Sequence, residues 1–188
     1  EFLSRFEYRE IASEIPLQPR WEAPRSIQAW WPSNPGEGED GKSTISVNWM
    51  WGETTDPGAA LSAQVLSFIL LGHGGAPLQK AIIDSGIGED LSPVSGLESD
   101  LRQMVFSAAV RGIDADRGEA FEKLIGDTLG SLADGGLDAD LVEGALRTVE
   151  FRAREIRGGS PFGMRLMKRA LRGWLHDRPP IESLAFDA

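Results

Sequence analysis

The chain has 188 residues, a formal net charge of −10 and no cysteine. Its length fits one domain, and the missing thiols exclude disulfides, cysteine catalysis and thiolate metal sites, which suits a reducing compartment. The negative charge repels phosphate backbones, so we expect no nucleic-acid partner.

The chain offers no segment for insertion into a membrane, and we expect no membrane partner. A bilayer span needs about 20 consecutive apolar residues, and the longest apolar stretch, residues 61–71, is interrupted by Ser62, Gln64 and Ser67. No basic segment followed by an apolar stretch marks a signal peptide. The sequence begins at Glu1 without an initiator methionine. We therefore interpret it as a piece of a longer chain and expect a cytoplasmic parent.

The N-terminal part is predicted to be extended and then to form a hairpin. Residues 1–25 contain three prolines among charges and aromatic side chains. Such a composition resists regular structure and indicates a connector between domains. Alternate residues are apolar in "SIQAWW" (residues 26–31) and again in "TISVNWMWG" (residues 44–52). These two segments are predicted to pair as strands across a long acidic loop.

Helix signals follow. Asp56 and Pro57 form an N-cap and N1 pair that predicts a helix to about residue 71. After a cluster of glycines, Pro77 opens a short second helix, with Gly86 at the position of a C′ glycine. Further along the chain, apolar residues at helical spacing predict three closing helices, at about residues 121–132, 142–153 and 166–174.

A second pair of strands is predicted between the two groups of helices. Residues 88–97 are polar and extended, and Pro93 indicates an edge position. In "LRQMVFSAAVRG" (residues 101–112) alternate residues are apolar. The resulting order β-β-α-α-β-β-α-α-α predicts a single α+β domain over residues 26–188, in two layers, with a mainly antiparallel sheet and helices packed on one face.

The segment "LLGHGGAPLQKAIIDSG" (residues 70–86) is the first candidate for a binding site. It is not a phosphate loop, because Lys80 does not follow a glycine and Ala81 stands where Ser or Thr is required. It is not a dinucleotide fingerprint, because Pro77 replaces the last glycine and a helix precedes it. Two interpretations stay open: a binding loop, or only a hinge in which glycines permit positive φ.

Other residues suited to chemistry are few. For His73 a role as ligand or acid–base group competes with that of a locally hydrogen-bonded loop histidine, which we favour. His176 is expected at an exposed helix C-terminus, where the dipole favours a cation. Clustered carboxylates show no EF-hand pattern and indicate solvated loops. Four tryptophans form either an aromatic binding face or half-buried cross-strand pairs, the interpretation we favour: Trp30, Trp31, Trp49 and Trp51.

Several segments together carry a family resemblance. "APLQKAIIDSGIG" (residues 76–88) and "FSAAVRGI" (residues 106–113) are followed by "DGGLDADLVEGALRTVEFRARE" and "MKRALRGWLHDRPPIESLAF". From about Arg20 to the C-terminus, the chain resembles the presequence-protease branch (subfamily C) of the M16 pitrilysin/insulinase zinc peptidases. In that branch a small-residue loop precedes a helix of similar sequence, and a strand then follows.

The resemblance implies an M16-type α+β domain in a chamber of four related domains, within an enzyme that degrades unstructured peptides. Zinc in this family is bound by an inverted His-x-x-Glu-His motif and a distal Glu. The present sequence lacks that motif and resembles the second domain of the N-terminal half. We therefore expect no catalytic residue, metal ligand or cofactor in this fragment, and zinc in the parent's preceding domain.

The resemblance also implies partners: the preceding zinc-binding domain, the C-terminal half of the same chain, and the unstructured peptide substrate. Related processing peptidases contact their substrates through a glycine-rich loop at a comparable place. Backbone N–H groups would provide that contact. This implies a substrate-contact loop made of Gly72, His73, Gly74 and Gly75. The alternative is an M16-like scaffold or interaction module whose parent has no active metal site.

Overall fold

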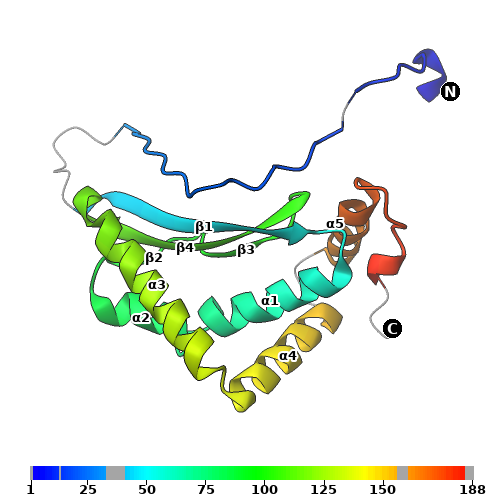
Figure 1. Cartoon of the computed structure of the whole chain (residues 1–188). Helices are drawn as coiled ribbons and strands as arrows, with labels where there is room; N and C mark the ends of the chain where they lie inside the picture. The colour runs from blue at the N-terminus through cyan, green and yellow to red at the C-terminus, as the bar shows by residue number, and fades with distance from the viewer. Residues whose placement is uncertain (1, 13, 33–40, 156–160, 185–188) are drawn as a thin grey trace.

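The computed structural model describes residues 2–12, 14–32, 41–155 and 161–184 (Figure 1). These residues form an antiparallel sheet with helices on one face, which confirms the predicted α+β class. The strands are β1 (Ser43–Glu53), β2 (Asp90–Leu91), β3 (Gly96–Glu98) and β4 (Gln103–Ile113). The helices are α1 (Pro57–Leu71), α2 (Pro77–Ser85), α3 (Gly118–Gly135), α4 (Ala139–Arg154) and α5 (Phe162–Trp174). Three short 3-10 helices are η1 (Leu3–Arg5), η2 (Ala115–Arg117) and η3 (Glu182–Leu184).

Strand β4 lies at the centre of the sheet. It pairs with β1 on one side and with the short strands β2 and β3 on the other. Because both of its edges are covered, β4 is buried along most of its length. The register places apolar residues of β1 and β4 opposite one another on the helix-covered face: Ile45 with Val110, Val47 with Ala108, and Trp49 with Phe106.

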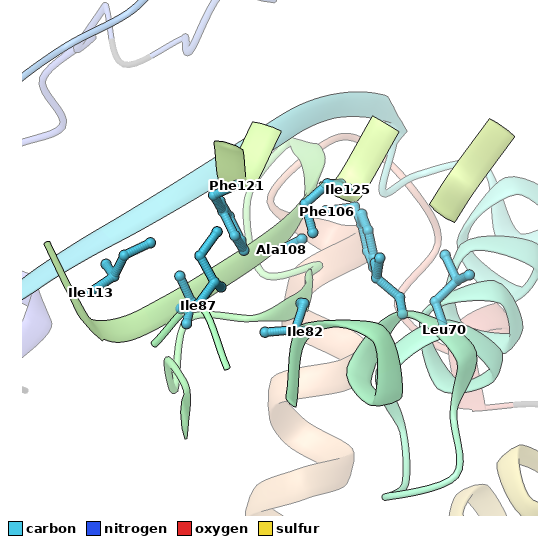
Figure 2. Close-up of a cluster of buried hydrophobic side chains, with 10 residues drawn as sticks. Leu70, Ile82, Ile87, Phe106, Ala108, Ile113, Phe121 and Ile125 are labelled. Carbon is cyan, nitrogen blue, oxygen red and sulfur yellow. The ribbon is translucent and has the colours of Figure 1, made fainter. Parts of the chain in front are cut away.

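The hydrophobic core lies between this face of the sheet and helices α1, α2 and α3 (Figure 2). Phe121 and Ile125 reach it from α3, and Leu78 and Ile82 from α2. These four side chains have at most 1% of their surface exposed. Burying each large apolar side chain stabilises the fold by about 1.5–3 kcal/mol. Apolar contacts therefore hold helices α2 and α3 on the sheet.

Helix α4 packs on α1 and not on the sheet. Ala145 of α4 forms a second buried cluster with Val65 and Ile69 of α1. This cluster adds a partial third tier to the two layers that the sequence predicts (Figure 1). Helix α5 lies at the end of the sheet, where Arg172 donates to Ser99 Oγ at 3.1 Å.

Local signals in the sequence place the ends of α1 and α2 correctly. The Asp56 carboxylate accepts the Ala59 N–H at 3.0 Å, as an N-cap does. Gly86 adopts the left-handed conformation, with φ 58° and ψ 23°, directly after α2. Among the described residues, no helix combines the length and apolar character that crossing a bilayer requires.

The first predicted hairpin is not formed in the structure. Residues 26–31 are extended but carry no strand, and β1 pairs with β4 instead. Strand β4 pairs with one edge of β1, and residues 26–31 pair with neither strand. The second predicted pair of strands, within residues 88–97 and 101–112, is formed, since Leu97 of β3 pairs with Phe106 of β4. The extended N-terminal segment, predicted to end at residue 25, continues through residue 32.

Ser95 completes the edge of β4 where β2 and β3 leave a gap. Its hydroxyl donates to the Ala109 carbonyl at 2.9 Å and accepts the Ala109 N–H at 3.0 Å. Ala109 is fully buried, so water cannot replace this partner. The side chain of Ser95 therefore takes the place of a backbone group of a neighbouring strand.

Replacing Ser95 with alanine is expected to lower the free energy of unfolding by about 1–3 kcal/mol, because the buried Ala109 N–H loses its acceptor. Urea unfolding followed by circular dichroism measures the change. Ser131→Ala, on the exposed side of α3, is the matched control and should change stability by less than about 0.5 kcal/mol. Equal effects of the two substitutions would contradict this role for Ser95.

Candidate functional site

The candidate site is the turn between α1 and α2, residues 72–75, which we call the glycine corner. Helix α1 ends where the Gly72 N–H donates to the Phe68 carbonyl at 2.8 Å. The chain then turns, and the Ala76 N–H donates to the His73 carbonyl at 2.8 Å before α2 begins. All four residues of the corner are exposed. The structure thus brings the four predicted contact residues together at one exposed turn.

Side chains from two helices hold the corner in place. The His73 ring lies against the Phe68 ring, with 5.6 Å between their centroids. On the same Phe68 ring, the Arg152 guanidinium of α4 lies 4.9 Å from the centroid, a cation–π contact. The corner is therefore connected to α4 as well as to α1. Nothing in the local sequence indicates the contact with Arg152, because the two residues lie far apart in the chain.

His73 is hydrogen-bonded within the corner. Its Nδ1 accepts the Gly75 N–H at 3.2 Å. With its amide nitrogen turned toward the carbonyls, the Gln79 side chain donates to Leu71 O at 2.9 Å and to His73 O at 3.0 Å. Gln79 therefore satisfies carbonyl groups at the end of α1. This geometry is that of a loop histidine with local partners.

The three glycines of the corner differ in what surrounds them. A Cβ on Gly72 would lie 2.3 Å from Phe68 Cδ2 and 2.5 Å from the Phe68 carbonyl oxygen. A Cβ on Gly74 would meet nothing within 4 Å, and one on Gly75 would meet only the His73 ring, at 3.5 Å. None of the three has a positive φ. The interpretation as a hinge rested on positive φ, and that reason is wrong. Close packing explains why position 72 is a glycine, but it does not explain Gly74 or Gly75.

A second exposed surface lies on the other side of the molecule, on the face of the sheet that no helix covers (Figure 1). On β1 this face carries Thr44, Ser46, Asn48 and Met50, in register with Arg111, Ala109, Ser107 and Val105 of β4. Most of these side chains are small or polar; those on β1 are exposed, whereas Ser107 and Ala109 of β4 are buried. We call this surface the open sheet face. The glycine corner belongs to the helix layer, so the two surfaces point in different directions.

The remaining candidates from the sequence form no centre in the described part of the chain. There, no group of three or more His, Asp or Glu side chains is placed to hold a metal ion. The predicted absence of a cofactor stays a prediction. Carboxylates pair on the surface, as Asp90 does with Arg111 at 3.0 Å. His176 lies half-buried in the turn after α5. Burial, with the charge of Arg172 adding to it, lowers the pKa of Arg169 in α5.

The tryptophans divide between two environments. Trp49 packs across the strands on Phe106, with ring centroids 5.9 Å apart, as a cross-strand pair. Trp30 and Trp31 are 81% and 61% exposed. The interpretation of these two residues as half-buried cross-strand pairs is wrong, because residues 26–31 have no strand partner. Trp51, near the end of β1, is 36% exposed.

Individual known proteins match this chain along its whole length, although no family model matches it. "Protein HypA" of Clostridium perfringens is 34% identical over 188 residues, which is 100% of this chain and 19% of the relative. "Presequence protease 1, chloroplastic/mitochondrial" of Arabidopsis thaliana is 34% identical over 99% of this chain and 18% of the relative. "Presequence protease, mitochondrial" of Xenopus tropicalis is 29% identical over 97% of this chain and 18% of the relative.

The chain belongs to the M16 metallopeptidase family. Within that family it belongs to the presequence-protease branch, subfamily C, which the resemblance predicted. The chain spans about a fifth of the length of these relatives, at 18–19%. This coverage is consistent with the predicted position as one domain of such a peptidase.

The predicted cytoplasmic location is contradicted. The relatives from Arabidopsis thaliana, Xenopus tropicalis and Mus musculus are named as chloroplastic or mitochondrial proteins, which points to organelles. The prediction rested on the absence of targeting signals from a sequence that spans about a fifth of these relatives. Such an absence carries no information about residues outside that sequence.

Proposed function

We propose that the chain is a non-catalytic domain of a zinc-dependent M16 peptidase, the second domain of its N-terminal half. In this proposal residues 1–25 are the connector from the preceding domain and residues 26–188 are the domain itself. The observation that carries it is the whole-length homology to presequence proteases in a sequence without a His-x-x-Glu-His motif. The zinc ion and the general base then lie in the preceding domain.

The open sheet face is proposed to form part of the wall of the peptidase chamber. Its rows of Ser, Thr and Asn side chains suit contact with water and with extended peptides more than tight packing on another domain. The proposed partners are the preceding zinc-binding domain, the C-terminal half of the parent chain and an unstructured peptide. The length of the relatives, about five times that of this chain, supports such partners.

The test of non-catalysis uses the purified fragment. We expect it to hold no stoichiometric zinc by elemental analysis and to leave an unstructured peptide intact when zinc is added. Metal-dependent turnover that copurifies with the fragment would contradict the proposal. The sequence of the parent before Glu1 distinguishes the zinc-dependent enzyme from the alternative, a scaffold without a metal site. A His-x-x-Glu-His motif there supports the enzyme, and its absence supports the scaffold.

The glycine corner is proposed as a contact site for the substrate peptide. The support is that Gly74 and Gly75 are exposed and that neither φ nor packing requires glycine at these positions. Small residues there leave the backbone open to an approaching chain, which can bind through backbone hydrogen bonds.

The substitution Gly74→Leu in the full-length parent is expected to raise KM for an unstructured peptide up to about tenfold, the equivalent of one lost hydrogen bond. The melting temperature should stay unchanged, because the added side chain meets open space. Gly130→Leu, at an exposed and open position of α3, is the control and should leave KM unchanged. Equal KM values for the two variants would contradict a substrate contact at the glycine corner and would support a hinge alone.

A further inference from the structure

Strand β1 presents a long free edge. Within the described residues it pairs only with β4, so the backbone groups along its other side have no strand partner. From Thr44 to Gly52 it contains no charged residue and no proline. Natural proteins protect edge strands with charges, prolines, bulges or a covering segment. The register irregularities between Ser43 and Thr44 and between Met50 and Glu53 lie at the two ends of β1, so the middle of the edge is left without such protection.

The same chain carries an unpaired segment with the pattern of a strand. Residues 26–31 are extended, and Ile27 and Trp31 are 90% and 61% exposed. Ile27, Ala29 and Trp31 alternate with Gln28 and Trp30, so one side of an extended chain here is apolar. Large apolar side chains grouped on one side of an extended segment favour burial against another surface.

Contacts of the preceding residues place this segment near the sheet. The Gln18 N–H donates to Gln103 Oε1 at 2.6 Å, and Arg102 donates to the Ile15 carbonyl. Gln103 pairs with Glu53, the last residue of β1, so these two hydrogen bonds anchor the N-terminal segment at the C-terminal end of that strand. From the anchor the segment runs in the direction opposite to β1 (Figure 1).

We propose that Ser26–Trp31 is the partner of the β1 edge and adds to it as an antiparallel strand. Its apolar side then extends the core-facing row formed by Ile45, Val47 and Trp49. Only residues 32–42 separate the two segments, and this tether gives a local concentration that a separate peptide does not match. Pairing would also fix the connector, and so the position of whatever it joins, relative to this domain.

Engineered disulfides test the pairing directly, because the chain has no cysteine. Gln28→Cys is combined in turn with Thr44→Cys, Ser46→Cys or Asn48→Cys on the open sheet face. A disulfide forms only when the two Cα atoms come within about 4.4–6.8 Å. We expect one of the three pairs to form an intramolecular disulfide at least about tenfold faster than Gln28→Cys with Ser131→Cys, the control on α3. Rates equal to the control in all three pairs would overturn the proposal, as would disulfides that link only two separate chains.

Hydrogen exchange provides a second readout in the otherwise unchanged chain. Gln28→Pro and Ala29→Pro each remove one backbone donor. Donors alternate sides along a strand, so one of the two points to β1 in the proposed pairing, and an edge strand accepts proline only where its N–H points to solvent. We expect one of the two variants to speed exchange at the β1 amides that point away from β4 by at least about tenfold, while the amides bonded to β4 stay protected. Ala23→Pro, in the same N-terminal segment but outside the proposed strand, should leave both sets unchanged. Exchange that is identical in the unsubstituted chain and in all the proline variants would show that the edge of β1 is unpaired.

Discussion

Replacing Phe121 with alanine is expected to lower the free energy of unfolding by about 3–5 kcal/mol. The Phe121 side chain is fully buried and joins α3 to the sheet in the main core (Figure 2). The substitution removes its apolar surface and leaves a cavity that the helix and sheet refill only in part. Since single domains are stable by about 5–15 kcal/mol, this loss leaves the fold marginal.

The matched control is Phe151→Ala. Phe151 is 62% exposed on α4, so the same chemical change should shift stability by about 0.5 kcal/mol or less. Urea unfolding gives the midpoint and the m-value for each variant, and the comparison requires m to stay constant. Equal destabilisation by the two substitutions would mean that the core does not lie where the structure places it.

Gly112→Ala is expected to destabilise the fold by about 2–5 kcal/mol, from two separable causes. Gly112 has φ +70°, a conformation that costs a residue with a Cβ about 1–2 kcal/mol. The new Cβ would also lie 2.3 Å from Glu89 Cγ, and such overpacking costs about 1–3 kcal/mol. Glu89 cannot easily retreat, because its N–H donates to the Arg111 carbonyl at 2.9 Å.

Two further glycine variants separate these causes. Gly86 has φ +58° in open space, so Gly86→Ala should show only the conformational cost of about 1–2 kcal/mol. Gly130 is helical, exposed and in open space, so Gly130→Ala should instead stabilise the fold by about 0.5–1 kcal/mol. If Gly112→Ala and Gly86→Ala have equal effects, the contact with Glu89 is not tight.

Local signals in the sequence predict the parts of the fold that depend on neighbouring residues. The cap at Asp56 and the C′ glycine at Gly86 involve groups within a few positions of each other, and both are correct. The alternation in residues 26–31 indicates an extended chain but not its partner. The apolar stripe of α4 likewise indicates a buried face, and nothing in it shows that the face packs on α1.

The same limit applies to the candidate site. The sequence predicts that residues 72–75 form a turn between two helices, and the structure agrees. Which glycine the fold requires depends on where the Phe68 ring lies, and the Arg152 contact with that ring comes from a distant helix. The spacing of residues along the chain predicts neither the position of the Phe68 ring nor its contact with Arg152. The family resemblance contributed what spacing could not, since it identified the presequence-protease branch from several short segments together.

The separation of the two exposed surfaces has a consequence for how a peptide meets this domain. The open sheet face looks away from the helices, and the glycine corner lies among them. A short peptide lying flat on the sheet cannot reach the corner without passing around the edge of the domain. If Gly74→Leu raises KM, the domain's helical side or rim borders the path of the substrate, and substitutions at Ser46 or Asn48 should then matter less.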